Sequence, residues 1–254
     1  ILPSFHITMD DHRRNRTVCA EEKVAGIEVS GTPIDKLGRE YVDMLKKAGV
    51  KMFHKVGCLR HAKHAEEAGY DGIYAAGIEE GGHPLNDDVT TMVLTPKIAE
   101  QLSIPVVTVG GIVDGKSMAA ALALGAEGVM MATRFMATKE CQVHDNIKQE
   151  IVKRQEFDTT LICKSIGLQG RAIKNKLAQE ILEAESRGAS ITELAPLITG
   201  ERCRVAWETG DVDVAPMMMG QSLGRIYEVK TCREVIEDMV NGARVEIDRI
   251  RGLF

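Results

Sequence analysis

The chain has 254 residues and a net charge of −5 at pH 7, an acidic balance that does not favour nucleic acid or an anionic membrane as a partner. No apolar run is long enough to span a bilayer, so no membrane partner is expected. The six cysteines are scattered without a Cys-x-x-Cys pair, which predicts reduced thiols in a cytoplasmic protein.

Strands and helices alternate in the first half of the chain. Short apolar runs predict strands, and apolar residues at helical spacing predict helices. Residues 1–4 resemble the end of a strand, and residues 10–16 predict a loop or short helix. Further strands are expected at 24–29, 50–56, 72–76, 104–109 and 128–131, with helices at 37–48, 59–68, 93–102 and 117–124 between them.

These strands begin roughly every 20 to 35 residues, which is the spacing of βα units in a barrel. The fold class predicted is therefore α/β, a TIM (β/α)8-type barrel. Such a barrel needs eight strands, so we expect the chain to lack its N-terminal βα units. An open α/β sheet that is whole with these strands is the alternative.

The pattern changes after residue 135. Helices are expected at 144–154, 172–185 and 191–197, followed by an irregular segment at 200–219. An amphipathic helix at 232–250 is expected to return to the barrel. We therefore predict three parts: a barrel part over residues 1–140, a helical cap over 141–229, and a C-terminal helix over 230–254 that packs back on the barrel.

Two predicted strands end in small residues that suit phosphate. Gly110 and Gly111 follow one strand, and Ala132 and Thr133 follow the next. Such turns expose backbone N–H groups, and helical patterns follow both, so these groups should lie near helix N-termini. Loops after neighbouring strands form the phosphate site of many barrels. The Gly-x-Gly-x-x-Gly spacing of a Rossmann turn is missing.

The longest loop between a predicted strand and helix holds the candidate for chemistry. It contains Gly81 and Gly82, which allow close approach of a flat ligand, and His83, which would point into the same mouth. Lys55 stands near the end of the preceding strand and would place a cation there. His61 and His64 lie three apart on a helix, but no third ligand is apparent, so no metal site is expected.

Several motifs together resemble a known family. They lie at residues 77–83, 105–112, 119–126, 132–135, 138–140, 144, 171–175 and 220–221. Motifs of this kind in this order resemble the nitronate monooxygenase family, formerly called 2-nitropropane dioxygenase. That family also includes flavin-dependent enoyl-acyl carrier protein reductases and NAD(P)H:quinone reductases.

The resemblance implies FMN bound in a TIM barrel. The turns at Gly110 and Gly111 and at Ala132 and Thr133 would hold its phosphate. Lys55, Gly81 and Gly82 would lie along the flavin, and His83 would face the substrate as the catalytic residue. The family usually has glycine at the position of Ala132, so the extra methyl group is a departure.

The activity implied is oxidation of an alkyl nitronate, a small-molecule substrate, by dioxygen. Within the family, the alternative is a reductase that takes hydride from NAD(P)H and passes it to an enoyl thioester or a quinone. An alternative of another class is a non-catalytic remnant that binds flavin or another phosphorylated ligand. A homo-oligomer is compatible with each of these readings.

Overall fold

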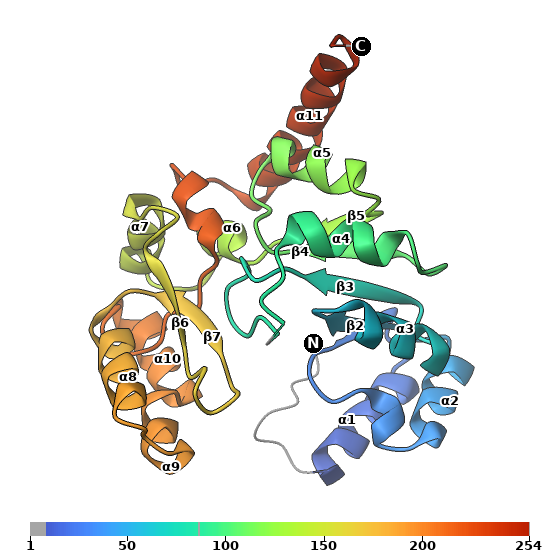
Figure 1. The fold of residues 1–254 in the computed structure, drawn as a ribbon, viewed down its shortest axis with the longest axis horizontal. Helices are drawn as coiled ribbons and strands as arrows, with labels where there is room; N and C mark the ends of the chain where they lie inside the picture. Colours follow the sequence, from blue (N-terminus) through green and yellow to red (C-terminus); the bar gives the residue numbers. More distant parts are fainter. Residues whose placement is uncertain (1–8, 86, 254) are drawn as a thin grey trace.

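The first half of the molecule is a parallel sheet whose strands follow one another in chain order (Figure 1). The computed structural model describes residues 9–85 and 87–253. All five strands expected in this range are present, whereas the strand end expected at residues 1–4 lies outside it. The strands are β1 (Gly26–Val29), β2 (Lys51–Val56), β3 (Gly72–Ala76), β4 (Val106–Val109) and β5 (Gly128–Met130).

Helices connect successive strands, as in consecutive units of a TIM-type barrel. They are α2 (Arg39–Lys47), α3 (Leu59–Ala68), α4 (Thr91–Ala99) and α5 (Gly115–Ala123), with the short 3-10 turn η1 (Ile34–Lys36) before α2. Apolar side chains from α2, α3 and α4 and from strands β1 to β4 fill one core. Its fully buried members include Val29, Leu45, Met52, Ile73 and Ile98.

A longer helix than expected precedes the sheet. The sequence predicts a loop or short helix at residues 10–16, whereas α1 (Met9–Glu21) is a helix of 13 residues. Ion pairs from Arg13 to Asp10 and from Arg14 to Asp11 lie at helical spacing. Ion pairs three residues apart stabilise this helix, which has little apolar periodicity. Asp10 and Asp11 also stand in its first turn, where acidic side chains interact favourably with the helix dipole.

Register brings the carboxyl ends of the strands to one edge of the sheet. Val29 pairs with His54, Ala76 with Val109, and Val109 with Met130. The loops that follow these strands therefore meet on one side, where the arrowheads in Figure 1 point toward the helix-rich segment. This is the side on which α/β barrels carry their sites.

His54 is buried between β1 and the helices. Its Nδ1 atom donates to the Val29 carbonyl oxygen at 2.8 Å, because a carbonyl can only accept, so the neutral ring carries its proton on Nδ1. The ring also lies against Tyr70, with ring centroids 5.3 Å apart. Burial lowers the pKa of His54 below its ordinary value.

We expect this histidine to make folding sensitive to acid. Below about pH 6.5 the unfolded chain binds a proton at residue 54 and the folded chain does not, so the free energy of unfolding falls as the pH is lowered. The loss reaches at most about 1.4 kcal/mol per pH unit until the folded pKa is passed. Urea unfolding between pH 5 and 7 should show a shallower pH slope for His54→Asn. Equal slopes would contradict the assignment.

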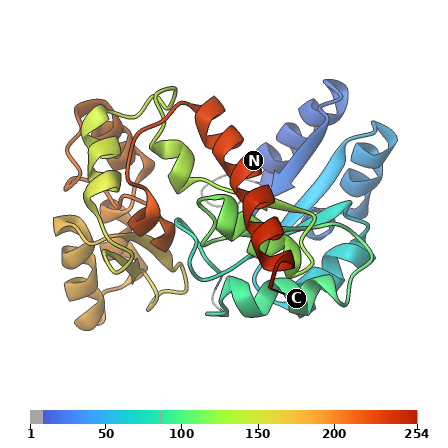
Figure 2. The same cartoon turned by 90° about the horizontal axis from the view of Figure 1, so that it is seen from above.

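The segment from α6 to η3 is rich in helices and lies to one side of the sheet (Figures 1 and 2). It contains its own buried clusters, one around Ile147, Ile151 and Met219, and one around Ile162 and Ile181. The division of the chain into barrel and cap remains a prediction. The elements are α6 (Thr133–Met136), α7 (Asp145–Lys153), β6 (Thr159–Ile162), β7 (Gly170–Ile173), α8 (Lys176–Ser186), α9 (Ile191–Leu194), η2 (Ala195–Leu197), α10 (Gly200–Thr209) and η3 (Gln221–Arg225).

Two predictions for this half are wrong. The helix expected at 172–185 begins only at Lys176, because residues 170–173 form β7 of an antiparallel hairpin. The Asn175 side chain then accepts from the amide of Ala178 and caps the start of the helix. The segment 200–219 was expected to be irregular, yet it opens with α10. Thr199 caps the start of α10, and Gly210 ends it with a φ of 76°.

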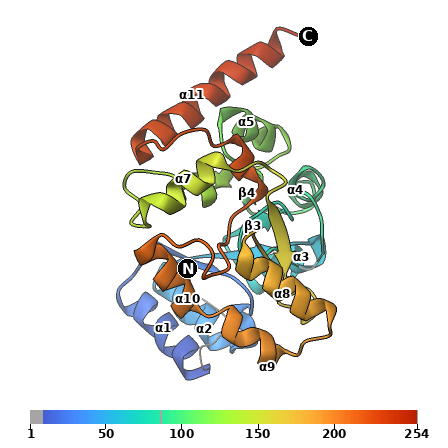
Figure 3. The same cartoon turned by 90° about the vertical axis from the view of Figure 1, so that its left-hand side faces the viewer.

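The last helix, α11 (Cys232–Arg251), packs along α5. The two helices meet at Gly115 and Gly242, where a Cβ atom on Gly115 would collide with the Gly242 backbone. Val235 and Met239 pack against Ile112 beside this crossing. The carboxyl-terminal end of α11 extends away from the other helices (Figures 1 and 3). Among the described residues, no helix has the length and apolar character needed to cross a membrane.

Candidate active site

A hollow of about 660 Å³, partly open to solvent, lies at the carboxyl end of the sheet. Every strand of the sheet contributes to it from its carboxyl end or the loop that follows. The lining residues are Glu28, Ser30, Lys55, Glu79, Glu80, Gly81, Val109, Gly110, Gly111, Ile112, Met130, Met131, Ala132, Thr133, Gly220 and Ser222.

The turn after β4 presents bare backbone to this hollow. Gly110 and Gly111 have φ values of 96° and 74°, a conformation that favours glycine. A Cβ atom on Gly110 would lie 2.9 Å from the Gly77 carbonyl oxygen, so the backbone is tightly packed there. Within residues 9–85 and 87–253, the amides of Gly111 and Ile112 donate no hydrogen bond. They are available to an anion.

The position of this turn relative to α5 differs from the expectation. The sequence predicts that its N–H groups lie at a helix N-terminus, but the start of α5 is already satisfied. Asp114 accepts from the Ser117 amide, and Ser117 Oγ accepts from the amides of Val113 and Asp114. The Asp114 carboxylate thus occupies the N-terminus of α5. An anion at Gly111 would therefore be bound by the backbone amides of the turn and not by the helix end.

The turn after β5 leads directly into a short helix. Ala132 immediately precedes α6 with a φ of −119°, which any residue can adopt, and its amide donates no hydrogen bond to a described residue. Thr133 is buried, and its Oγ1 accepts from the Gly220 amide at 3.0 Å. Two adjacent strand-end turns and a short helix are typical of barrel phosphate sites. The amides of Gly111, Ile112 and Ala132 therefore fit a phosphate group, such as that of the FMN that the resemblance implies.

Lys55 enters the hollow as part of an ion pair. Its Nζ atom lies 2.8 Å from Glu80 Oε1 and donates to the His83 carbonyl oxygen at 2.9 Å. The two side chains of the pair are only 15% and 6% exposed. Burial raises the pKa of Glu80, and the Lys55 ammonium opposes that shift. The charge of Lys55 is thus largely balanced by a neighbour that sequence reasoning did not identify.

The loop after β3 is fixed to its surroundings by backbone contacts. Glu79 accepts from the amide and hydroxyl of Thr91 at the start of α4. Gly81 packs so closely on Met219 and Gly220 that a Cβ atom would collide with their backbone. Close approach therefore requires glycine at position 81, and Gly81 lines the hollow.

Gly82 and His83 are placed differently from the other predicted site residues. Neither lines the hollow. The amide and carbonyl of Gly82 pair with those of Arg171 in β7. The buried Arg171 side chain also donates to the Ile78 carbonyl oxygen and to Thr159 Oγ1, so it joins the loop to the hairpin. Gly82 is therefore a link to the helix-rich segment and not a wall of the hollow.

His83 is exposed and lies beside the hollow. It lines a second depression that shares Ser30 and Lys55 with the first. It also lines a third, mostly apolar one with Ile162, Leu168, Met218 and Cys163. Burial raises the pKa of Cys163 to about 11, so this cysteine is a protonated thiol at neutral pH. His83 therefore lines both depressions beside the hollow.

Some lining residues could have been found from the sequence and others could not. Glu28 and Ser30 stand at the carboxyl end of a predicted strand. Because α/β barrels carry their sites at these ends, both residues could have been predicted to line the site. Gly220 and Ser222 arrive from a distant segment, and only the family resemblance pointed to residues 220–221. Nothing in the sequence indicated that Arg171 would hold the loop.

Comparison with known proteins agrees with this architecture. The family model for nitronate monooxygenase matches residues 9–242. FabK from Thermotoga maritima superposes with a TM-score of 0.88 at 32% identity, covering 99% of this chain and 86% of that one. Nitroalkane oxidase from Streptomyces ansochromogenes superposes with a TM-score of 0.77 at 22% identity, over 95% of this chain and 70% of that one, which supports the fold alone.

Curated relatives include one described as a nitronate monooxygenase. A Rhodococcus jostii 5-hydroxy-7a-methyl-1-oxo-octahydro-1H-indene-4-carboxyl-CoA dehydrogenase is 30% identical over 85% of this chain and 70% of its own length. A Staphylococcus aureus protein described as "Probable nitronate monooxygenase" is 30% identical over 79% of this chain. The match spans 58% of the length of the staphylococcal relative.

Proposed function

The chain belongs to the nitronate monooxygenase family, and we propose that it is an FMN-dependent oxidoreductase that oxidises alkyl nitronates with dioxygen. The observation that carries the proposal is the pair of strand-end turns, whose Gly111, Ile112 and Ala132 amides are available to a phosphate. The flat ring would lie in the hollow beside them, and the adjoining His83 would face the substrate.

The residues of the chain would divide the work as follows. FMN, when bound, supplies the electron transfer from substrate to dioxygen. The two turns would hold its phosphate through backbone N–H groups, and the Lys55–Glu80 pair with Gly81 would line its ring. His83 would bind the substrate or take its proton. Residues 1–140 would carry the flavin, and residues 141–229 would cover the substrate.

A second candidate is an NAD(P)H-dependent reductase that acts on enoyl thioesters or quinones. The Rhodococcus jostii relative favours it, because that dehydrogenase acts on a CoA thioester. The mostly apolar depression around Ile162, Leu168 and Met218, which His83 also lines, could take an acyl chain. The two candidates share the flavin site and differ in the electron donor.

The cofactor can be tested without knowledge of the substrate. Purified protein saturated with FMN and then freed of excess should release about one FMN per chain when denatured, as chromatography against FMN and FAD standards would show. A protein that retains FAD in preference to FMN, or neither, would contradict the proposed phosphate site.

Ala132→Gly is expected to leave FMN affinity unchanged or to increase it modestly. The substitution removes an exposed methyl group from the wall of the hollow, and the ordinary φ at this position means that no backbone strain is relieved. Fluorescence titration of FMN would measure the change. A clear loss of affinity would show that the methyl group contacts the ligand favourably.

A further inference from the structure

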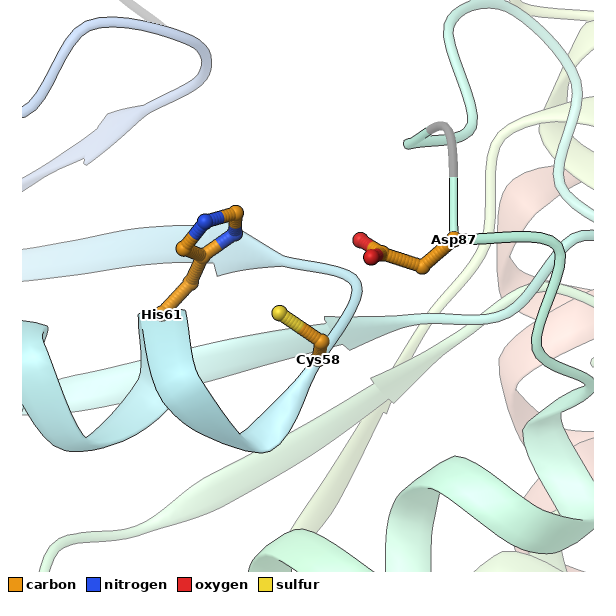
Figure 4. Close-up of side chains that lie close together, drawn as sticks. All are labelled: Cys58, His61 and Asp87. Carbon is orange, nitrogen blue, oxygen red and sulfur yellow. The ribbon is translucent and has the colours of Figure 1, made fainter.

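A cluster of metal-ligand side chains lies outside the hollow. Cys58, His61 and Asp87 each offer a ligand atom, and these atoms all lie within 4.8 Å of one another. Figure 4 shows Cys58 and His61 at the start of α3, with the Asp87 carboxylate directed toward them from the loop after β3. The sequence predicts no metal site, because His61 and His64 lack a third ligand; in the structure His64 contacts Asp35 at 2.9 Å.

We propose that Cys58, His61 and Asp87 bind one divalent ion of the zinc class. Thiolate, imidazole and carboxylate together suit Zn²⁺, whereas Mg²⁺ prefers oxygen ligands. Zn–S and Zn–N bonds of about 2.3 and 2.0 Å place the ligand atoms of a tetrahedral site roughly 3.5 Å apart. The ligand atoms therefore need to approach one another by at most about 1.3 Å, which the exposed His61 and Asp87 can do by rotation.

The backbone already holds the two halves of the cluster together. Cys58 precedes α3 in an extended conformation, and His61 follows at a spacing of three residues, so both face the same side of the helix. Across from them, a Cβ atom on Gly57 would lie 2.7 Å from Leu85 Cβ and 3.3 Å from Asp87 Oδ2. The absence of a side chain at Gly57 is what lets Asp87 approach.

The charges also suit a divalent cation. A Cys58 thiolate and the Asp87 carboxylate together would balance the two positive charges of the ion. Among the described residues, Arg60 is the one cation in hydrogen-bond contact with the cluster. It donates to His61 Nε2 at 3.4 Å, which is a long contact between exposed side chains. Either side chain can turn away, or His61 can use Nδ1.

The position of the site suggests what the ion would do. It would join the start of α3, which follows the strand carrying Lys55, to the loop carrying His83. Lys55 already donates to the His83 carbonyl oxygen in this loop. Metal binding would therefore restrict the loop from a second side and stabilise the folded chain, since a ligand that binds only the folded state raises its melting temperature.

Calorimetric titration of tag-free, FMN-loaded protein with ZnCl2 after dialysis against a chelator tests the site. We expect one Zn²⁺ per chain, no binding of Mg²⁺, and about one proton released from the Cys58 thiol to the buffer. The released proton is measured by repeating the titration in buffers of different ionisation enthalpy. Zn²⁺ should also raise the melting temperature.

Single substitutions locate the ion. Cys58→Ser, His61→Asn and Asp87→Asn should each weaken Zn²⁺ binding by at least about 100-fold, since changes to groups that merely support a metal ligand already cost 10- to 100-fold. His64→Asn on the same helix and Cys141→Ser at another partly buried cysteine are matched controls and should bind as the parent does. No Zn²⁺ binding by the parent, or equal binding by all three ligand variants, would overturn the proposal.

Discussion

Gly111→Asp is expected to abolish FMN binding. The substitution places a carboxylate on a turn that lines the hollow, close to Glu79, where it would repel the phosphate and take up its space. At an effective dielectric constant near 20, two like charges 4 Å apart repel by about 4 kcal/mol, close to a 1,000-fold loss of affinity. FMN fluorescence titration of the parent and the variant would measure it.

The chain offers a matched control for backbone strain. Gly188 has a φ of 77°, nearly that of Gly111, and lies in an open turn after α8, away from the hollow. Gly188→Asp introduces the same side chain in the same conformation, so it should lower stability by a similar amount while retaining FMN. Unchanged FMN binding in Gly111→Asp, or an equal loss in both variants, would remove Gly111 from the phosphate site.

His83→Asn is expected to separate two forms of the substrate. If His83 removes the proton from the carbon of a neutral nitroalkane, activity on that form should fall by about 10²- to 10⁴-fold. Activity on the preformed nitronate, from which no proton has to be taken, should persist. Steady-state rates with both forms, compared with those of a His64→Asn control, would measure the difference.

Other outcomes of the His83 experiment have other meanings. If His83 only anchors the anion, both forms should weaken together, mainly through KM. In an NAD(P)H-dependent reductase, flavin reduction by the nicotinamide should persist in the variant, and the later step that reduces the substrate should slow. Full activity with every substrate would leave His83 outside the mechanism.

The parallel sheet could be predicted because buried strands appear as continuous apolar runs that end in small residues. Runs such as 104–109, followed by Gly110 and Gly111, carry that signal without ambiguity. The hairpin could not be predicted in this way. Its strands have four residues each, and alternation over so short a span is easily taken for the start of the helix that follows.

Positions within the site were predictable where they depend on strand ends and unpredictable where they depend on packing. Lys55 was expected at the mouth, but its partner Glu80 lies 25 residues away and is brought there only by the pairing of β2 with β3. The resemblance places Gly82 along the flavin, and the structure adds that its backbone groups pair with Arg171 of the hairpin, an element that the sequence did not reveal. Asp87 likewise lies near Cys58 only because the fold brings two separate loops together.

The most direct test of the central proposal is an anaerobic mixture of FMN-loaded protein with an alkyl nitronate, NADH or NADPH in separate cuvettes. We expect the nitronate to bleach the visible absorbance of the bound flavin and air to restore it. Bleaching by NADH or NADPH but not by the nitronate would contradict nitronate oxidation and favour the reductase. Flavin that no donor bleaches would contradict both activities and leave a protein that only binds the cofactor.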